Sequence, residues 1–337
     1  NKRSIAINLK NPDAQPVVRR LVENADVFIQ NFRHGTADKL GVGYEQLAEI
    51  NPGLVYCSIS GYGSLGPYRD RPGQDLIVQG YSGSMFSVGR DGDAPQPGAL
   101  WAADVMTGYQ AAIGILSALH ERQTSGIGQH VEVDMFSVVL DAQLQELVTF
   151  LNTGESPHRT SSPTAHASIP APYGVYKTSD SWLTLAMSPL PALGEMLDDD
   201  VLRSMTNYND GMTQRDVVWQ RIHKQFESRT TDEWVARADE VGVWAGPVYD
   251  YDSLQRDPHA LATGMFVDQP HRDKTRPIKT VRPPIRMSRS RVAIDKSAPP
   301  LGGHTDEILA TLGFNLDERQ ALYDVGATAT DAKEEIK

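Results

Sequence analysis

The sequence predicts an α/β fold built on a parallel sheet with crossover helices, together with a second, smaller domain. Within residues 1–60, apolar runs of strand length alternate with amphipathic runs of helix length, and the connections between them are short. At 337 residues the chain exceeds the usual size of one hydrophobic core, so we expect two domains. Its 40% hydrophobic and 22% charged residues indicate an ordinary globular protein rather than a disordered or fibrous one.

The parallel sheet is predicted from the order of the elements near the N-terminus. A helix is expected to begin at Asn11-Pro12-Asp13, where a capping side chain precedes a proline and an acid, and to continue through residues 17–22. Residues 25–29 then form a buried strand, residues 44–50 a second helix and residues 54–60 a second strand. Strands that are joined in this way through a helix pair in parallel.

A long, mostly buried helix is predicted in the middle of the chain. From Asp104 to about Arg122 the apolar residues recur at helical spacing. A strand over residues 129–134 and a long helix over residues 135–152 are expected to follow. Residues 152–172 are rich in Thr, Ser, Pro and His, which indicates an interdomain linker or an active-site loop.

The elements after residue 173 predict a smaller α+β domain. Two short apolar runs, residues 174–178 and 182–187, flank Ser179-Asp180-Ser181 and predict a β-hairpin. Helices are expected over residues 190–197, 213–229 and 232–241, and the last of them begins with the capping box Thr230-x-x-Glu233. A proline-rich run over residues 276–300 leads to a final helix near residues 305–312.

Charge and composition exclude several classes of function. A net charge of -11 argues against binding nucleic acid or anionic membranes, so any phosphate-bearing ligand needs a local basic pocket. No apolar run approaches the roughly 20 residues of a membrane-spanning helix, and the first residues do not resemble a signal peptide. We therefore expect a cytoplasmic protein that does not insert into membranes. The single cysteine, Cys57, lies in an apolar run and is expected to be a small core residue.

Neither a dinucleotide site nor a metal site is predicted. The glycines of Gly61-x-Gly63-x-x-Gly66 are followed at once by Pro67, and no helix begins on them, so we expect a loop with positive φ angles and close backbone approach. The nine histidines show no metal-ligand spacing. Only His166 draws attention, because it lies in the stretch between the expected domains.

Asp104 has two interpretations that local sequence does not separate. At the start of a predicted helix, an aspartate commonly caps the free amide groups. The same position suits a carboxylate nucleophile, because the helix dipole and the free amides keep the carboxylate ionised and hold developing negative charge.

Several short stretches of the chain are weak as single motifs but occur together in the order that is typical of one family. They are residues 1–5, 25–27, 31–33, 60–63, 66–68, 72–76, 114–122, 124–129, 245–248, 257–258 and 303–309, and they extend over nearly the whole chain. In these stretches the chain resembles the family III CoA-transferases, the CaiB/BaiF family, which includes formyl-CoA transferase, carnitine CoA-transferase and the α-methylacyl-CoA racemases.

The resemblance implies a Rossmann-like large domain, a small domain and a homodimer of two interlocked rings. On this basis we expect a CoA-binding large domain over residues 1–155, a linker over 156–173, a small domain over 174–275, and a return segment with a C-terminal helix over 276–337. The family's first βα unit has no counterpart in this chain, which begins without Met. We therefore expect further CoA and active-site residues in a missing N-terminal segment.

The resemblance also implies a mechanism. The family's nucleophilic aspartate corresponds to Asp104, which would carry mixed-anhydride and aspartyl-CoA thioester intermediates while CoA passes from an acyl-CoA to a small carboxylic acid. No tightly bound cofactor or metal is implied. The family's CoA contacts correspond to Ile7, Leu9, Lys10, Asn31, Phe32, Arg33, Lys39, Arg71 and Gln74. Of these, Lys10, Arg33 and Lys39 carry positive charge suited to the nucleotide phosphates.

Two alternatives remain within the family. A racemase needs a titratable group on each side of the substrate α-carbon, and racemases place a histidine where this chain has Gln74. Because glutamine cannot exchange that proton, transfer is favoured over racemisation. The other alternative is an inactive CoA-binding homologue. The glycine-run loop of formyl-CoA transferase is also absent, and residues 164–168 occupy the comparable region, which argues against formate and oxalate as substrates.

Overall fold

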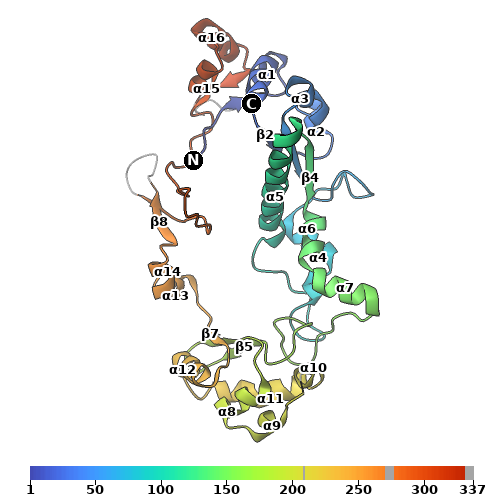
Figure 1. Cartoon of the computed structure of the whole chain (residues 1–337), viewed down its shortest axis with the longest axis vertical. Coiled ribbons are helices and arrows are strands. Elements are labelled where there is room, and N and C mark those ends of the chain that lie inside the picture. Colours follow the sequence, from blue (N-terminus) through green and yellow to red (C-terminus); the bar gives the residue numbers. More distant parts are fainter. Residues whose placement is uncertain (208, 270–276, 331–337) are drawn as a thin grey trace. The chain divides into compact units, whose positions relative to one another are not determined.

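The structure, a computed structural model, describes residues 1–207, 209–269 and 277–330 (Figure 1). By its internal contacts the chain forms two compact units. Unit 1 comprises residues 1–59, 111–132 and 250–337, and unit 2 comprises residues 60–110 and 133–249. These groupings differ from the domain boundaries expected from the sequence, which remain a prediction. In the described part of the chain, no helix has the length and apolar character needed to cross a membrane.

Unit 1 contains the parallel sheet that the alternation of elements predicts. Its strand order is β2 (Val27–Gln30), β3 (Val55–Ser60) and β4 (His130–Asp134), and β2 and β3 pair in parallel with Val27 opposite Val55. The helices α1 (Gln15–Glu23), α2 (Thr36–Lys39) and α3 (Tyr44–Ile50) connect them. Val18 and Val22 of α1 and Leu47 of α3 pack with the start of β3 into one core. The predicted parallel strands and crossover helices are therefore confirmed, but the expected burial of the first strand is wrong, since no residue of β2 is buried and Ile29 is 56% exposed.

Both ends of the described chain meet in unit 1. Strand β1 (Ala6–Ile7) pairs antiparallel with β10 (Thr328–Ala329), next to α15 (Thr305–Thr311) and α16 (Leu316–Asp324) (Figure 1). Val17 of α1 packs with Leu309 and Leu322 of these helices. The helix predicted near residue 305 is confirmed, but its prediction as the last helix is wrong. Asn315 and Glu318 form a capping box that opens α16.

The remaining elements of unit 1 are short. Helices α13 (Tyr251–Leu254) and α14 (Pro258–Ala262) precede an antiparallel pair of strands, β8 (Phe266–Gln269) and β9 (Ile278–Val281). Asp250 and Asp257 cap the two helices by accepting hydrogen bonds from backbone amides.

The central helices differ from the prediction in burial and at one break. Helix α5 (Ala102–Ser125) begins two residues before Asp104 and extends past Arg122. The prediction that this helix is mostly buried is wrong, because Tyr109, Ile113 and Leu116 are more than half exposed. After β4, the single helix expected over residues 135–152 is instead two helices, α6 (Met135–Ala142) and α7 (Leu144–Thr153). Gln143 separates them because its backbone, at φ -102° and ψ 23°, leaves the helical conformation.

A small core in unit 2 supports the start of α5. It involves α4 (Asp75–Ser82), which the sequence did not predict, and α6. Val78 of α4 is fully buried and packs with Ala103 of α5 and Val139 of α6. The short 3-10 helix η2 (Ser84–Phe86) follows α4.

The rest of unit 2 is an α+β layer. Strands β5 (Gly174–Lys177), β6 (Trp182–Leu185) and β7 (Ala245–Pro247) form an antiparallel sheet in that order, so the predicted hairpin is confirmed. The helices are α8 (Leu190–Leu197), α9 (Asp200–Ser204), α10 (Asp210–Thr213), α11 (Arg215–Phe226) and α12 (Thr231–Val241). The predicted capping box of Thr230 and Glu233 opens α12. Leu183, Leu193, Ile222 and Phe226 lie in a core that water does not reach.

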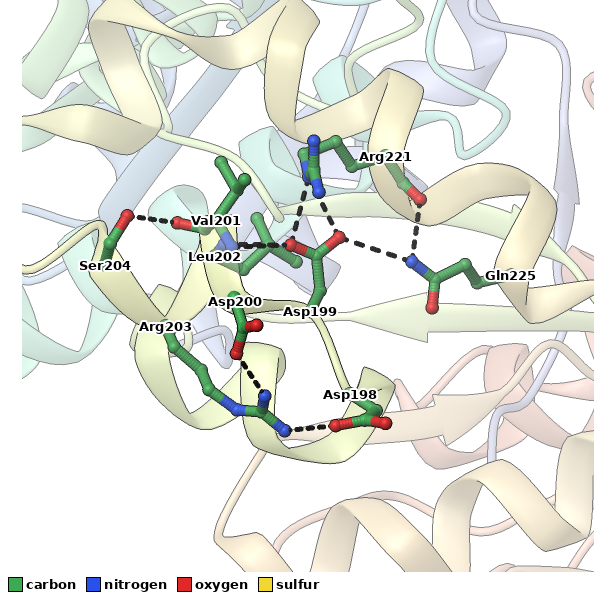
Figure 2. A network of polar contacts seen from close by, with 9 residues as sticks. All are labelled: Asp198, Asp199, Asp200, Val201, Leu202, Arg203, Ser204, Arg221 and Gln225. Atoms are coloured by element: carbon green, nitrogen blue, oxygen red, sulfur yellow. Dashed lines mark hydrogen bonds and ion pairs between the residues drawn. The ribbon is translucent and has the colours of Figure 1, made fainter.

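A buried carboxylate joins two helices of this layer (Figure 2). Asp199 caps α9 by accepting hydrogen bonds from the amides of Val201 and Leu202, and it accepts two more from Arg221 Nε on α11, at 3.1 and 2.9 Å. Burial alone would raise the pKa of Asp199, but the Arg221 and Leu202 hydrogen bonds outweigh it and hold the pKa below its ordinary value of 3.8.

We predict that Asp199→Ala lowers the free energy of unfolding by about 2 kcal/mol, because it leaves buried donors without an acceptor. Asp200→Ala is the matched control. Its side chain is 94% exposed and pairs with Arg203 on the surface, so we expect a loss below about 1 kcal/mol. Urea unfolding measures both.

The same network gives a pH dependence. Since folding lowers the pKa of Asp199, its contribution is complete above the unfolded value of 3.8 and is lost as the pH falls through the folded value. The difference between wild type and Asp199→Ala should therefore shrink below that pH. A difference that does not change with acid would contradict the assignment.

Candidate functional site

Asp104 lies exposed in the first turn of α5 and does not cap it. The first hydrogen bond of the helix runs from the Val105 amide to the Trp101 carbonyl at 3.0 Å, which places Trp101 at the capping position. Asp104 is therefore the third residue of the helix. The capping interpretation of this aspartate is wrong.

A second aspartate supplies the missing cap. The Asp104 amide donates to Oδ2 of Asp75, the first residue of α4, at 3.1 Å. Nε2 of Gln79 donates to Oδ1 of Asp75, and the Gly98 amide donates to Oε1 of Gln79 at 2.9 Å. Asp75 and Gln79 are each only 5% exposed. One buried chain of hydrogen bonds thus joins α4, the segment before α5 and the amide of Asp104.

The two aspartates are suited to different chemistry. Both oxygens of Asp75 accept hydrogen bonds within a nearly buried side chain, so this group is a structural acceptor. The Asp104 carboxylate is exposed, and within the described residues it has no hydrogen-bond or ion-pair partner. It lies at the positive end of a 24-residue helix. An ionised carboxylate with free oxygens at such a place can act as a nucleophile.

The glycine-rich loop lies beside the turn that precedes α4. A Cβ on Gly61 would lie 2.5 Å from the Cα of Gly73, so the two backbones touch where any side chain would separate them. Gly63 and Gly66 have φ angles of 76° and 81°. The expected loop with positive φ and close approach is confirmed, and α4 begins only at Asp75, well after these glycines.

Arg71 and Gln74 flank this turn. The Arg71 guanidinium lies 4.2 Å from the centre of the Tyr68 ring and donates from Nη1 to the Tyr81 hydroxyl at 2.9 Å. Gln74 is exposed, and it occupies the position before α4 without using its side chain as a cap. An exposed amide next to the buried Asp75 can donate or accept hydrogen bonds, but it cannot transfer a proton.

Four of the expected CoA contacts line one cavity in unit 1. Ile7, Leu9, Asn31 and Phe32 border a cavity of about 460 Å³ whose wall is otherwise mainly apolar. Side chains of α1 and β2 complete that wall. The structure therefore brings together residues that lie more than twenty positions apart in the sequence.

The expected cationic contacts are exposed. Lys10 follows β1, Arg33 follows β2, and Lys39 ends α2, and none of the three lies in the cavity wall. All three belong to unit 1, whereas Arg71 and Gln74 belong to unit 2. Among the described residues, no cluster of His, Cys, Asp and Glu could hold a metal ion.

His166 lies in a segment that is well anchored. Its Nδ1 accepts from the Ser168 amide at 3.3 Å, which leaves the proton on Nε2, 3.6 Å from the Glu146 carboxylate. The Ala167 amide bonds to the Ser87 carbonyl, and Thr164 forms a bridge with Gly89. His166 is thus fixed between α7 and the segment after α4.

Asp75 and Gln79 are the site residues that sequence reasoning missed. Their spacing, an acid followed by an amide four residues later, is that of a helical i, i+4 pair, and it follows a Pro-Gly turn. This signal could have placed a helix at residue 75. Only the folded chain shows that Asp75 reaches Asp104.

The comparisons with known proteins cover most of the chain. The profile of CoA-transferase family III matches residues 1–305. A succinate–glutarate CoA-transferase of Agrobacterium fabrum is 35% identical over 92% of this chain and 78% of the relative. A succinyl-CoA–D-citramalate CoA-transferase of Chloroflexus aurantiacus is 32% identical over 93% of this chain and 78% of the relative. The crystal structure of a CaiB/BaiF family protein from Brucella suis superposes with a TM-score of 0.80 at 32% identity, covering 92% of this chain and 82% of that one.

Proposed function

Since this chain belongs to CoA-transferase family III, we propose that it passes coenzyme A from an acyl-CoA to a carboxylic acid through intermediates on Asp104. The observation that carries the proposal is the exposed Asp104 carboxylate, unpartnered within the described residues, at the start of α5. Asp75 next to it is buried, and each of its oxygens accepts a hydrogen bond, so of the two aspartates Asp104 is the one exposed to a substrate.

The proposed reaction has four exchanges at carbonyl carbon. An Asp104 oxygen attacks the thioester carbonyl of the donor, and CoA thiolate leaves, which forms a mixed anhydride. The thiolate then attacks the aspartyl carbonyl, which releases the donor acid and leaves an aspartyl-CoA thioester. The acceptor carboxylate attacks this thioester and expels the thiolate again, and the thiolate finally attacks the acceptor's acyl carbon and frees Asp104. The covalent relay keeps the thioester energy that hydrolysis would lose, provided that water is excluded.

For the substrates we propose succinyl-CoA as the donor and a small dicarboxylate as the acceptor. The support is sequence similarity to two relatives, whose names give succinate and glutarate in one case and succinyl-CoA and citramalate in the other. CoA itself is a substrate in this scheme, and no tightly bound cofactor takes part. The cytoplasmic location expected from the sequence remains a prediction.

For CoA binding we propose the residues assigned from the family resemblance. The cavity beside Ile7, Leu9, Asn31 and Phe32 offers an apolar wall with two amide side chains, those of Gln30 and Asn31, which suits an adenine ring. Exposed Lys10, Arg33 and Lys39 would pair with the phosphates, and Arg71 and Gln74 would contribute from the turn before α4.

We also propose a homodimer of interlocked subunits. Apolar side chains that are more than half exposed recur along α5 at Tyr109, Ile113 and Leu116, and α7 has Leu144 and Leu151 exposed and no buried residue. Helices with so much uncovered apolar surface favour association with another protein surface. A second copy of this chain is the occupant that the family resemblance implies.

We predict that Asp104→Asn abolishes CoA transfer, with a loss of at least about 10⁴-fold, because an amide cannot form the anhydride. Wild type incubated with succinyl-CoA should gain the mass of CoA less one water, and hydroxylamine should remove it. Glu121→Gln, at the other end of α5, is the control and should keep both CoA transfer and formation of the CoA adduct. A CoA adduct that persists in Asp104→Asn would sink the nucleophile assignment.

We predict that Lys39→Gln raises the KM for succinyl-CoA about tenfold and leaves kcat unchanged, because a charge-assisted contact to phosphate is lost. The effect should shrink in high salt. Lys177→Gln, which changes an exposed lysine at the end of β5 in unit 2, serves as the matched control. A triple variant of Lys10, Arg33 and Lys39 with an unchanged KM would contradict the proposed phosphate contacts.

We predict that the protein runs as a dimer in size-exclusion chromatography with light scattering. Leu151→Glu should weaken the dimer about tenfold or more, because it places a charge in an apolar interface. Leu316→Glu also changes an exposed leucine, but at the start of α16, and should leave the mass unchanged. A wild-type protein that is monomeric at micromolar concentration would refute the proposed assembly.

A further inference from the structure

The start of α5 has an unusual source for its cap. The first amides of a helix lack partners within the helix and are commonly satisfied by a side-chain oxygen at the capping position. Here the capping position is held by Trp101, whose indole ring has no acceptor. The amide of Asp104 instead donates to Asp75, which lies 29 residues earlier in the sequence.

Asp75 accepts a hydrogen bond from the Asp104 amide that the Asp104 carboxylate could otherwise accept itself. Aspartate side chains readily bond to their own or a neighbouring backbone amide, and this holds the carboxylate against the backbone. Because the Asp104 amide is already bonded to Asp75, that competing contact is occupied. The Asp104 carboxylate is correspondingly exposed and, within the described residues, without a partner.

Gln79 fixes the orientation of Asp75. Its Oε1 must face the Gly98 amide, which donates to it at 2.9 Å, so its Nε2 must face Asp75 Oδ1. This leaves Asp75 Oδ2 for the Asp104 amide. Both side chains are only 5% exposed, so water has little access to replace either contact.

The charge of Asp75 is supported by helix ends. Within the described residues no Lys, Arg or His forms an ion pair with it. It is the first residue of α4, and it also faces the first turn of α5, so two helix N-termini direct partial positive charge towards it. Asp75 can therefore stay a buried acceptor without a cation.

We propose that Asp75, oriented by Gln79, is a positioning residue that keeps the Asp104 carboxylate free to attack the acyl-CoA; this inference rests on the proposed nucleophilic role of Asp104. Asp75 touches no reacting atom. It acts through the Asp104 amide by fixing the first turn of α5 and by occupying the amide that would otherwise bind the nucleophile.

The test compares three variants in a single turnover with excess succinyl-CoA, monitored as formation of the CoA adduct by mass. Asp75→Ala removes the acceptor of the Asp104 amide. We expect adduct formation to slow about 100-fold, because the reacting carboxylate is then misplaced. The KM for succinyl-CoA should stay within about twofold of the wild-type value. Asp75→Asn keeps one oxygen for the Asp104 amide but turns its NH2 group towards Gln79 Nε2, so it should recover only part of that loss, about tenfold. Asp134→Ala removes a different capping carboxylate in the same unit, at the start of α6, and is the matched control for stability.

Each outcome decides the inference. If Asp75→Ala forms the adduct as fast as Asp134→Ala, the positioning role is wrong. If Asp75→Ala does not fold, Gln79→Leu decides instead: a rate about tenfold or more below that of Asp134→Ala supports the role, and an equal rate overturns it. If Asp104→Asn itself still forms the adduct, the proposed function fails, whereas loss in Asp104→Asn with no effect of Asp75→Ala rejects only this inference.

Discussion

The hydrogen bond from the Asp104 amide to the buried Asp75 carboxylate is the contact on which the candidate site depends. It joins the first turn of α5 to the first residue of α4, and Gln79 extends it to Gly98. Val78 of α4 and Ala103 of α5 pack with Val139 in one core, so both helices are also joined by apolar contacts. The position of one exposed carboxylate is thus determined by buried groups in two other segments.

This arrangement separates two tasks that a single aspartate could not perform well. A capping carboxylate commits an oxygen to backbone amides, whereas a nucleophilic carboxylate must keep an oxygen free for the substrate. Asp75 is 5% exposed and uses both oxygens, and Asp104 is exposed. The glycine pair Gly61 and Gly73 supports the same geometry, because their backbone contact fixes the turn from which α4 begins.

Much of the fold could be predicted from the sequence, because its elements have strong local signals. The alternating runs before residue 60 predicted the parallel pair β2 and β3, and the Thr230 capping box predicted the start of α12. The break at Gln143 was not predicted, because no Gly or Pro marks that change in the backbone. Helix α16 was not predicted, because the helix near residue 305 was expected to be the last one. In the site, Asp104 was singled out, but Asp75 was not, because a contact across 29 residues depends on tertiary packing and leaves no local pattern.

The most direct test of Asp104 as the covalent carrier follows an oxygen atom. When the acceptor acid carries heavy oxygen in its carboxylate, its attack on the aspartyl thioester and the return of CoA leave one labelled oxygen on the enzyme. The account predicts that, after quenching and proteolysis, the peptide that contains Asp104 is heavier by one labelled oxygen and that no other peptide is labelled. Transfer of CoA to the acceptor with no label in the Asp104 peptide would contradict it.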